Sequence, residues 1–179
     1  FEDVTVLFAD LVGFTEFSAQ TSPRELVDIL NIVFSEFDRL AERHGLEKIK
    51  TIGDAYMAVA GLPFPLSDHA KFAAEMALDM LAGLEEFNKQ TGQCFSLRLG
   101  LNTGPVIAGV IGIKKFSYDL WGDTVNIASR MESSGVPGAV QVSSTTYHLL
   151  QNQYQFVERG SVSIKGKGDM TTYFLTGRK

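Results

Sequence analysis

The chain opens with a short run of apolar and β-branched residues, and longer stretches with helical periodicity follow it. Residues 4–9 predict a buried strand that ends at Asp10, followed by a loop over residues 11–20. Apolar residues then recur every three or four positions over residues 26–41, which predicts an amphipathic helix with one buried face. Its expected start is Ser22, because the sequence Ser-Pro-Arg-Glu combines a capping box with proline in the first turn.

The rest of the chain repeats this alternation of extended and helical patterns. Two apolar runs flank Gly53-Asp54, which predicts a β-hairpin with an acid at its tip. A second amphipathic helix is expected over residues 68–88, after Gly45 ends the first. The remaining runs predict strands at 97–101, 106–111, 116–121, around Val162 and at 173–175, and helices from Asp123 and over 143–150. This order predicts an α+β fold in which helices pack on a mostly antiparallel sheet.

Composition and charge fit one globular domain and argue against nucleic acid as a partner. Of the 179 residues, 45% are hydrophobic and 21% are charged, which is ordinary for a domain with one sizeable core. The formal net charge is -5, and Lys and Arg are scattered apart from short runs at 114–115 and 165–167. The electrostatic field of a negatively charged protein without a basic patch does not favour binding of a polyanion. We therefore expect a single domain over residues 1–179 that does not bind nucleic acid.

Cysteine content and hydropathy bear on the compartment. The single cysteine, Cys94, has no partner for a disulfide or a zinc site, so we expect a buried, inert thiol in a reducing, cytoplasmic environment. The longest uncharged apolar stretch, residues 104–113, is half of the ~20 residues that span a bilayer. The start of the chain lacks the pattern of a signal peptide. We expect a domain excised from a longer protein, with any regulatory or membrane-anchoring segment outside this sequence.

Two acidic residues are candidates for a metal site, because the predicted strand ends could bring them together. Asp10 ends the first strand and Asp54 lies at the hairpin tip, and paired carboxylates on rigid elements suit magnesium. Backbone N–H groups of residues 11–15, between strand and helix, can face a phosphate. Aspartate is also common at turns, so each acid taken alone is better explained by a structural role in a turn. No Walker pattern, dinucleotide fingerprint or nucleophile elbow occurs.

Two polar residues on the helix expected from Asp123 form a second candidate group. Asn126 and Arg130 are four positions apart and therefore project from one face. An amide and a guanidinium so placed suit a sugar and a phosphoryl group, although a solvated surface pair has the same spacing. Arg98 and Lys165, taken alone, are ordinary surface cations.

Four segments taken together resemble the catalytic domain of class III adenylyl and guanylyl cyclases. They are FADLVGFT at residues 8–15, KTIGDAYM at 50–57, YDLWGDTVNIASRM at 118–131 and KGKG at 165–168. They follow one another in the family's order, and the resemblance covers essentially the whole chain. Four such blocks in order do not arise by chance, so the resemblance outweighs the turn and surface interpretations given above.

The resemblance implies a ferredoxin-like α+β domain that is inactive alone and pairs head to tail with a second copy. Each active site would then draw residues from both subunits. In one subunit, Asp10, Asp54 and the Leu11 carbonyl would hold two Mg²⁺ or Mn²⁺ ions. The phosphate-binding groups of that subunit would be Arg98 and the amides near Phe14 and Thr15. The ions would activate the ribose 3′-hydroxyl and hold the triphosphate as pyrophosphate leaves.

The second subunit would complete the site with five polar side chains: Lys50, Asp119, Asn126, Arg130 and Lys165. By this resemblance Arg130 neutralises charge on the α-phosphate and Asn126 orients the ribose. A homodimer would have two equivalent sites because every one of these positions is retained, whereas inactive halves of heterodimeric cyclases usually lack one or more. The largely apolar hairpin over residues 106–119 is expected to contribute to the symmetric interface.

The choice of base rests on two positions. Residues 51–63 resemble guanylyl cyclases, but the guanylyl members of the family carry Glu and Cys where this chain has Lys50 and Asp119. Lysine and aspartate match the N1 acceptor and N6 donor of adenine, whereas guanine demands the opposite polarity. The sequence therefore favours an adenylate cyclase that converts ATP to cyclic AMP. A guanylate cyclase and a catalytically silent, cyclase-like dimerisation module are the alternatives, and the silent module would be expected to lack a metal-binding Asp or Arg130.

Overall fold

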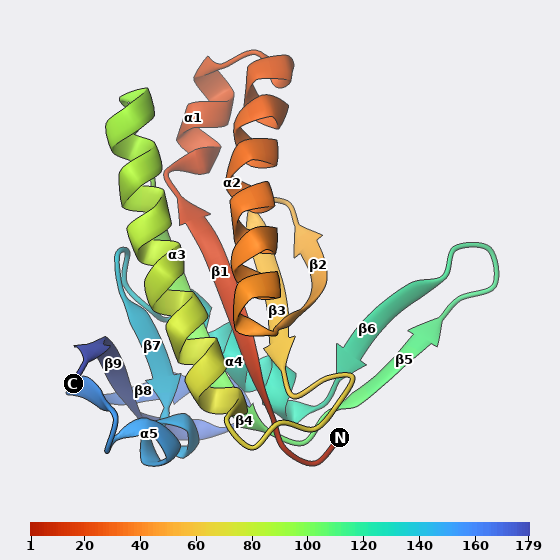
Figure 1. The fold of residues 1–179 in the computed structure, drawn as a ribbon, viewed down its shortest axis with the longest axis vertical. Coiled ribbons are helices and arrows are strands. Elements are labelled where there is room, and N and C mark those ends of the chain that lie inside the picture. Colours follow the sequence, from red (N-terminus) through yellow and green to blue (C-terminus); the bar gives the residue numbers. More distant parts are fainter.

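The computed structural model describes residues 1–179 as a large sheet with helices on both faces and one projecting hairpin (Figure 1). In chain order the elements are β1 (Val4–Val12), α1 (Phe14–Gln20), α2 (Pro23–His44), β2 (Glu47–Ile52), β3 (Ala55–Ala60), α3 (His69–Thr91), β4 (Ser96–Gly104), β5 (Ile107–Ile111), β6 (Ser117–Trp121), α4 (Asp123–Ser133), β7 (Val140–Ser143), α5 (Ser144–Leu150), β8 (Tyr154–Ile164) and β9 (Gly168–Arg178). The main sheet has seven strands in the order β2-β3-β1-β4-β7-β9-β8. Only the β4–β7 pair is parallel, which confirms the expected α+β fold with a mostly antiparallel sheet.

Strand β1 runs through the middle of the molecule and serves two hydrophobic cores. Its odd-numbered residues Leu7, Ala9 and Leu11 belong to the larger core, which α2 and α3 cover. Its even-numbered residues Val4, Val6 and Phe8 belong to a smaller core that includes Ala128 of α4. Successive side chains of a strand point to opposite faces, so Asp10 lies on the face of the sheet that α4 covers.

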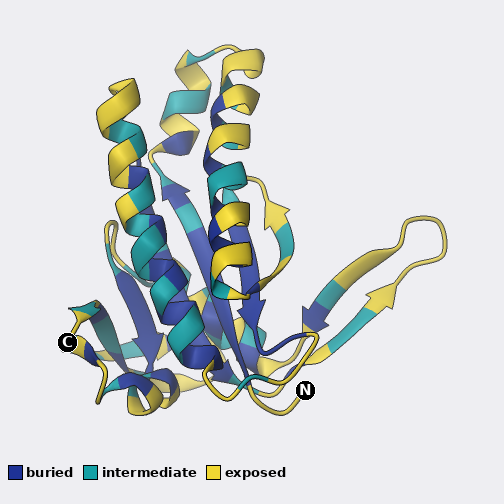
Figure 2. Cartoon of the chain, in the orientation of Figure 1, coloured by how far each residue is buried: buried dark blue, intermediate teal, exposed yellow.

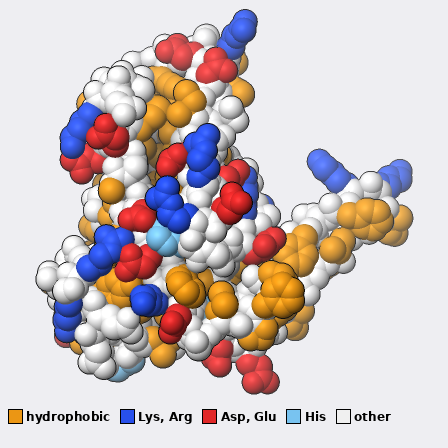
Figure 3. All heavy atoms as spheres, in the orientation of Figure 1, with side chains coloured by type: hydrophobic (Ala, Val, Ile, Leu, Met, Phe, Trp, Pro, Cys, Tyr) orange, Lys and Arg blue, Asp and Glu red, His pale blue; other side chains and the backbone are white.

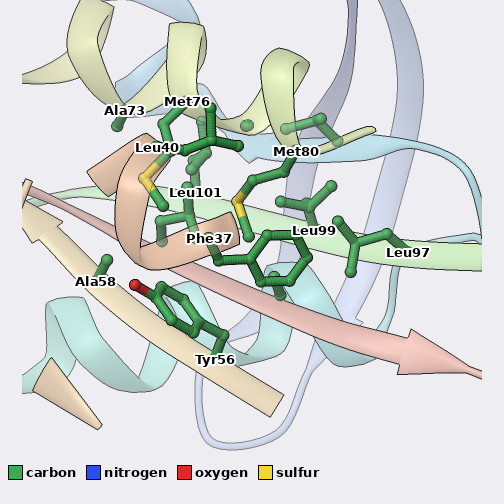
Figure 4. Close-up of a cluster of buried hydrophobic side chains, with 14 of the residues drawn as sticks. Phe37, Leu40, Tyr56, Ala58, Ala73, Met76, Met80, Leu97, Leu99 and Leu101 are labelled. Carbon is green, nitrogen blue, oxygen red and sulfur yellow. The ribbon is translucent and has the colours of Figure 1, made fainter. Parts of the chain in front are cut away.

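The larger core is closed by long side chains from the two helices (Figure 4). Phe37 of α2 and Met76 and Met80 of α3 lie within this cluster and are almost completely excluded from solvent. Burial of each such side chain contributes about 1.5–3 kcal/mol, which makes this face the main source of stability. The strands that carry the polar candidates therefore rest on a rigid support.

Local signals fix the ends of α2 and the turn between β2 and β3. The Ser22 hydroxyl accepts a hydrogen bond from the backbone N–H of Glu25 at 3.3 Å, and Pro23 occupies the first turn. Gly45 ends the helix with a φ of 72°, a left-handed conformation that glycine adopts without strain. Gly53 adopts a φ of 59° in the turn before Asp54. The predicted helix start and hairpin are confirmed.

The hairpin of β5 and β6 projects from the body and remains exposed (Figures 1 and 2). Its apolar side chains face solvent, including Ile107 at 72%, Ile113 at 94% and Phe116 at 76% exposure. Figure 3 shows hydrophobic side chains running along this arm. A contiguous apolar surface of this kind is typical of a protein interface.

Several sequence predictions were wrong in detail. β1 continues past Asp10 to Val12, since Leu11 and Val12 pair with β4. Most of the predicted loop over residues 11–20 is the helix α1, which forms because Phe14 and Phe17 pack together on Phe95. Strand β7 was not predicted: its sequence, Val-Gln-Val-Ser, alternates apolar and polar residues over only four positions, and all four residues are buried.

The thiol of Cys94 is exposed, not buried as expected. Cys94 lies in the connection between α3 and β4, where the neighbouring Phe95 takes the buried position. Cysteine therefore sits on the outer side of this turn. No helix of the protein combines the length and hydropathy needed to cross a membrane.

Candidate active site

Two carboxylates meet where β1 passes the β2–β3 turn. Asp10 lies opposite Ala55 of β3 and opposite Arg98 of β4. The backbone N–H of Leu11 donates to the carbonyl oxygen of Asp54 at 3.2 Å, which ties the turn to β1. The structure therefore brings Asp10 and Asp54 together, as the predicted strand end and hairpin tip allowed, and Leu11 lies beside them. We call Asp10, Asp54 and Arg98 the carboxylate edge.

Negative charge is crowded at this edge. Burial, followed by the charges of Asp54 and Glu132, raises the pKa of Asp10 to about 6, whereas the Arg98 guanidinium acts in the opposite direction. Asp10 and Glu132 thus share one guanidinium, Asp54 adds a further negative charge beside Asp10, and a cation would relieve the repulsion. No group of three or more metal-ligating side chains is present. This donor set fits Mg²⁺, which is commonly held by one or two carboxylates together with substrate phosphates.

Arg98 is held by two acids of different elements. Its Nε donates to Glu132 of α4 at 2.7 Å, and its Nη2 reaches Asp10 at the longer distance of 3.5 Å. Both carboxylates are largely shielded from solvent, with side-chain exposures of 12% for Glu132 and 22% for Asp10. The guanidinium is therefore fixed between Asp10 and Glu132 and does not extend freely into solvent.

The first turn of α1 follows the carboxylate edge directly. Gly13 precedes the helix with a φ of 86°, and Phe14 is buried while Thr15 is exposed. The first N–H groups of a helix have no partner within it, so these amides are available to an acceptor. The turn places Phe14 and Thr15 next to the end of the strand that carries Asp10.

A second group of polar side chains surrounds a pocket of about 670 Å³ between α4 and the β8–β9 turn. We call it the cationic pocket, because Arg130, Lys165 and Lys167 line it together with Asn126. Lys167 of the same turn pairs with Asp123 at 2.6 Å, which joins the turn to the start of α4. The predicted common face of Asn126 and Arg130 is confirmed, and Lys165 reaches it from a distant part of the chain.

Hydrogen bonds to the sheet hold the start of α4 in place. Asn102 of β4 is buried, and its Nδ2 donates to the carbonyl oxygen of Thr124 at 3.0 Å. Asn102 Oδ1 in turn accepts from the Ser143 hydroxyl at 2.6 Å. Buried polar networks with every partner satisfied hold elements in one arrangement. The helix that carries Asn126 and Arg130 is therefore fixed to the sheet.

Lys50 and Asp119 form a third group. Lys50 Nζ lies 2.5 Å from Asp119 Oδ2, joining β2 to β6 at the base of the projecting hairpin. Asp119 Oδ1 accepts from the backbone N–H of Leu120 at 2.7 Å, which fixes the orientation of the carboxylate. A lysine donor and an aspartate acceptor thus stand side by side.

One chain does not bring all the predicted residues into one cavity. The cationic pocket is lined by residues of α4 and the β8–β9 turn, and neither Asp10, Asp54 nor Arg98 is among them. Neither Lys50 nor Asp119 lines it. The structure therefore presents three separate groups of polar side chains.

Sequence reasoning missed two residues that shape the carboxylate edge. A Cβ atom at Gly100 would lie 2.1 Å from the backbone nitrogen of Glu132, so glycine is what allows α4 to approach β4. A glycine two residues after Arg98 in an alternating strand was the available signal for a close approach. Nothing in the local pattern around Glu132 pointed to its contact with Arg98.

Comparisons with known proteins give one consistent result. A sequence model described as the adenylate and guanylate cyclase catalytic domain matches residues 1–177. An adenylate cyclase of Mycobacterium tuberculosis is 48% identical over 179 residues, which cover 100% of this chain and 40% of that protein. The human guanylate cyclase soluble subunit beta-2 is 49% identical over 177 residues, covering 98% of this chain and 29% of that subunit. The chain thus spans less than half the length of these relatives.

A solved structure agrees over nearly the whole fold. The guanylate cyclase domain of RhGC from Catenaria anguillulae, crystallised in complex with GTP, superposes with a TM-score of 0.96 at 42% identity. The match covers 99% of this chain and 98% of that one. The carboxylate edge, the cationic pocket and the Lys50–Asp119 pair all lie within the matched residues. The chain therefore belongs to the family of class III adenylyl and guanylyl cyclase catalytic domains.

Proposed function

We propose that this domain is an adenylate cyclase, which converts ATP to 3′,5′-cyclic AMP and pyrophosphate with two Mg²⁺ or Mn²⁺ ions. The observation that carries the choice of ATP is the contact between Lys50 and Asp119 at 2.5 Å. This pair presents one donor and one acceptor side by side. Adenine offers the complementary N1 acceptor and N6 donor, whereas guanine would leave both charged groups mispaired.

The carboxylate edge is the proposed metal-binding half of the site. Asp10, Asp54 and the Leu11 carbonyl would hold the ions, and the raised pKa of Asp10 is the electrostatic mark of a place that favours a cation. Bound there, the ions would supply charge neutralisation for the triphosphate and a more acidic 3′-hydroxyl. Arg98, with the amides near Phe14 and Thr15, would bind the phosphates.

The cationic pocket is the proposed half that binds the reacting sugar and phosphate. Arg130 would stabilise the negative charge that develops on the α-phosphate, and Asn126 would orient the ribose for in-line attack. Lys165 would bind the phosphate chain from the β8–β9 turn. These three side chains line one pocket, so they can act on one bound nucleotide.

We propose further that the active unit is a homodimer with two shared sites. The metal-binding carboxylates of the same chain do not line its cationic pocket, which favours a second copy as the source of the other half of the site. The exposed apolar arm of β5 and β6 supplies surface for that contact. Because every expected residue is retained, the catalytically silent alternative lacks its expected mark. Localisation in the cytoplasm and a regulatory or membrane-anchoring segment in the full-length protein are part of the same proposal.

A guanylate cyclase is the second candidate, favoured by overall similarity. The human guanylate cyclase subunit is 49% identical, against 48% for the mycobacterial adenylate cyclase, so identity does not decide the substrate. The deciding experiment measures cyclic nucleotide production by the purified domain, from ATP and from GTP, with the same metal. We expect cyclic AMP to predominate. A preference for GTP would refute the argument from Lys50 and Asp119, and no product from either nucleotide would favour the silent module.

A further inference from the structure

Helix α4 approaches strand β4 closely at one point. A Cβ atom at Gly100 would lie 2.1 Å from the Glu132 backbone nitrogen and 2.7 Å from its Cα. Gly100 and Arg98 are alternate residues of β4 and therefore point to the same face of the sheet. The glycine thus seats the backbone of Glu132 directly over the strand, within side-chain reach of Arg98.

Glu132 makes one short, well-defined hydrogen bond from this position. Glu132 Oε1 accepts from Arg98 Nε at 2.7 Å, the distance of a strong charge-assisted hydrogen bond. The other contact of the guanidinium, from Nη2 to Asp10 Oδ2, is 3.5 Å long and is correspondingly weak. Arg98 lies directly opposite Asp10 in the β1–β4 register, so only the hydrogen bond to Glu132 draws it in another direction.

We propose that Glu132 is a positioning residue, which holds the Arg98 guanidinium through Nε and so keeps the Asp10 carboxylate available to a divalent cation. Arginine readily forms a two-pronged pair with a carboxylate when its geometry is free. Released from Glu132, the guanidinium would turn its terminal nitrogens onto Asp10 and compete with the metal. This inference rests on the metal-binding role of Asp10 proposed above.

The shielding of these groups makes the competition matter. The Glu132 side chain is 12% exposed and Arg98 is 28% exposed, so solvent screens their interaction less than it screens a surface pair. An unpaired charge that is shielded from solvent is unfavourable, so its side chain adopts the conformation that pairs it with the nearest opposite charge. Asp10 is that charge, because its carboxylate already lies within 3.5 Å of Nη2.

Direct titration of Mn²⁺ into the nucleotide-free protein tests the proposal, with free Mn²⁺ read by electron paramagnetic resonance. Glu132→Gln should weaken Mn²⁺ binding by about tenfold in the wild-type background. In an Arg98→Met background the same change should weaken it by less than about threefold, because the competing guanidinium is gone and only the lost charge of Glu132 remains. Glu36→Gln is the matched control, since Glu36 is a half-exposed glutamate paired with Arg39 on α2, and it should not change binding.

Two outcomes would overturn the proposal: unchanged Mn²⁺ affinity in Glu132→Gln, or an equal loss in both backgrounds. If Glu132→Gln does not fold, Glu132→Asp replaces it. Aspartate keeps the charge but is one methylene too short to hold Nε, so the same weakening is expected, and unchanged affinity would again overturn the proposal. Asp10→Ala separates the two ideas. If Asp10→Ala binds Mn²⁺ as the wild type does, the metal-binding role itself fails; if it loses Mn²⁺ while Glu132→Gln does not, only the positioning role fails.

Discussion

The carboxylate edge and the cationic pocket differ in what supports them. The carboxylate edge lies on the central strands β1 and β4 and on the β2–β3 turn, and Asp10 is largely shielded there and shares the Arg98 guanidinium with Glu132. The cationic pocket lies on the outer side of α4 and on a turn, with an open volume of about 670 Å³. One region is rigid and anionic, and the other is open and lined with cations. Their opposite charges suit the two components of the proposed ligand, since carboxylates attract divalent cations and cations attract phosphates.

The largest expected effect comes from removing a carboxylate from the rigid region. Asp54→Ala should leave the fold intact and lower turnover at least 100-fold, on the order of 3 kcal/mol of transition-state stabilisation. Steady-state assays with Mg²⁺ and a thermal unfolding scan measure both. Asp28→Ala, at an exposed position of α2, is the control and should leave turnover unchanged. Near-normal turnover of Asp54→Ala would contradict a metal-binding carboxylate edge.

Base choice tests the pair that lies outside both regions. The double change Lys50→Glu with Asp119→Cys should lower cyclic AMP formation and permit some cyclic GMP formation. Each polar match in a shielded pocket contributes about 1–3 kcal/mol, so the ratio of the two activities should shift by up to about 100-fold. Either single change should lose activity on ATP without gaining it on GTP, because one group stays mispaired.

Lys48→Glu is the matched control for base choice. Lys48 lies on the same strand but pairs with Asp38, so its replacement should leave the ATP preference as it is. A change in preference equal to that of the double variant would show that charge on β2 acts without specific contact to the base.

Mixing variants tests whether the two regions come from different chains. Asp10→Ala and Arg130→Ala should each be inactive alone, and their mixture should recover about a quarter of wild-type activity. Random pairing makes half of the dimers mixed, and each mixed dimer has one complete site of two. Asp10→Ala mixed with Asp54→Ala should recover nothing, because both changes damage the same half. If mixed dimers form and the first mixture stays inactive, the shared site is refuted.

The smallest effect concerns the stability of the metal-free protein. The pKa of Asp10 is raised to about 6 from an ordinary 3.8, so its charged form is disfavoured in the folded state. Folding therefore carries a penalty above pH 6, and the penalty declines as the pH falls through 6 toward 4. Asp10→Asn should raise the melting temperature at pH 7.5 by a few degrees. The difference from wild type should shrink at pH 5, and an unchanged difference at both pH values would contradict this cause.

Sequence patterns predicted those parts of the molecule whose determinants are local. The start of α2 could be predicted because Ser22 and Pro23 lie within its first turn, and Gly45 marked its end. The pairing of Asp10 with Asp54 followed from two strand ends and a turn. The grouping of Asn126 with Arg130 followed from their spacing alone, whereas the roles of both groups came from the family resemblance.

Contacts between distant segments account for what the sequence did not predict. The helix α1 depends on packing of Phe14 and Phe17 against Phe95, which lies after α3. The Glu132–Arg98 contact depends on the close approach of α4 to β4 at Gly100 and on the register of β1 with β4. Both join segments that lie far apart in the sequence. Cys94 was placed wrongly because its residue type was weighed without its neighbour Phe95.

The exposed arm of β5 and β6 bears on how the rate of product formation depends on the concentration of the chain. If the arm joins two incomplete copies, then far below the dissociation constant of the pair the rate of product formation rises with the square of the chain concentration. Dilution alone would abolish the activity. Any tether that raises the local concentration of chains would increase the fraction of dimers and with it the rate. A regulator could then change the activity by changing dimer formation alone, without contacting any residue that takes part in the reaction.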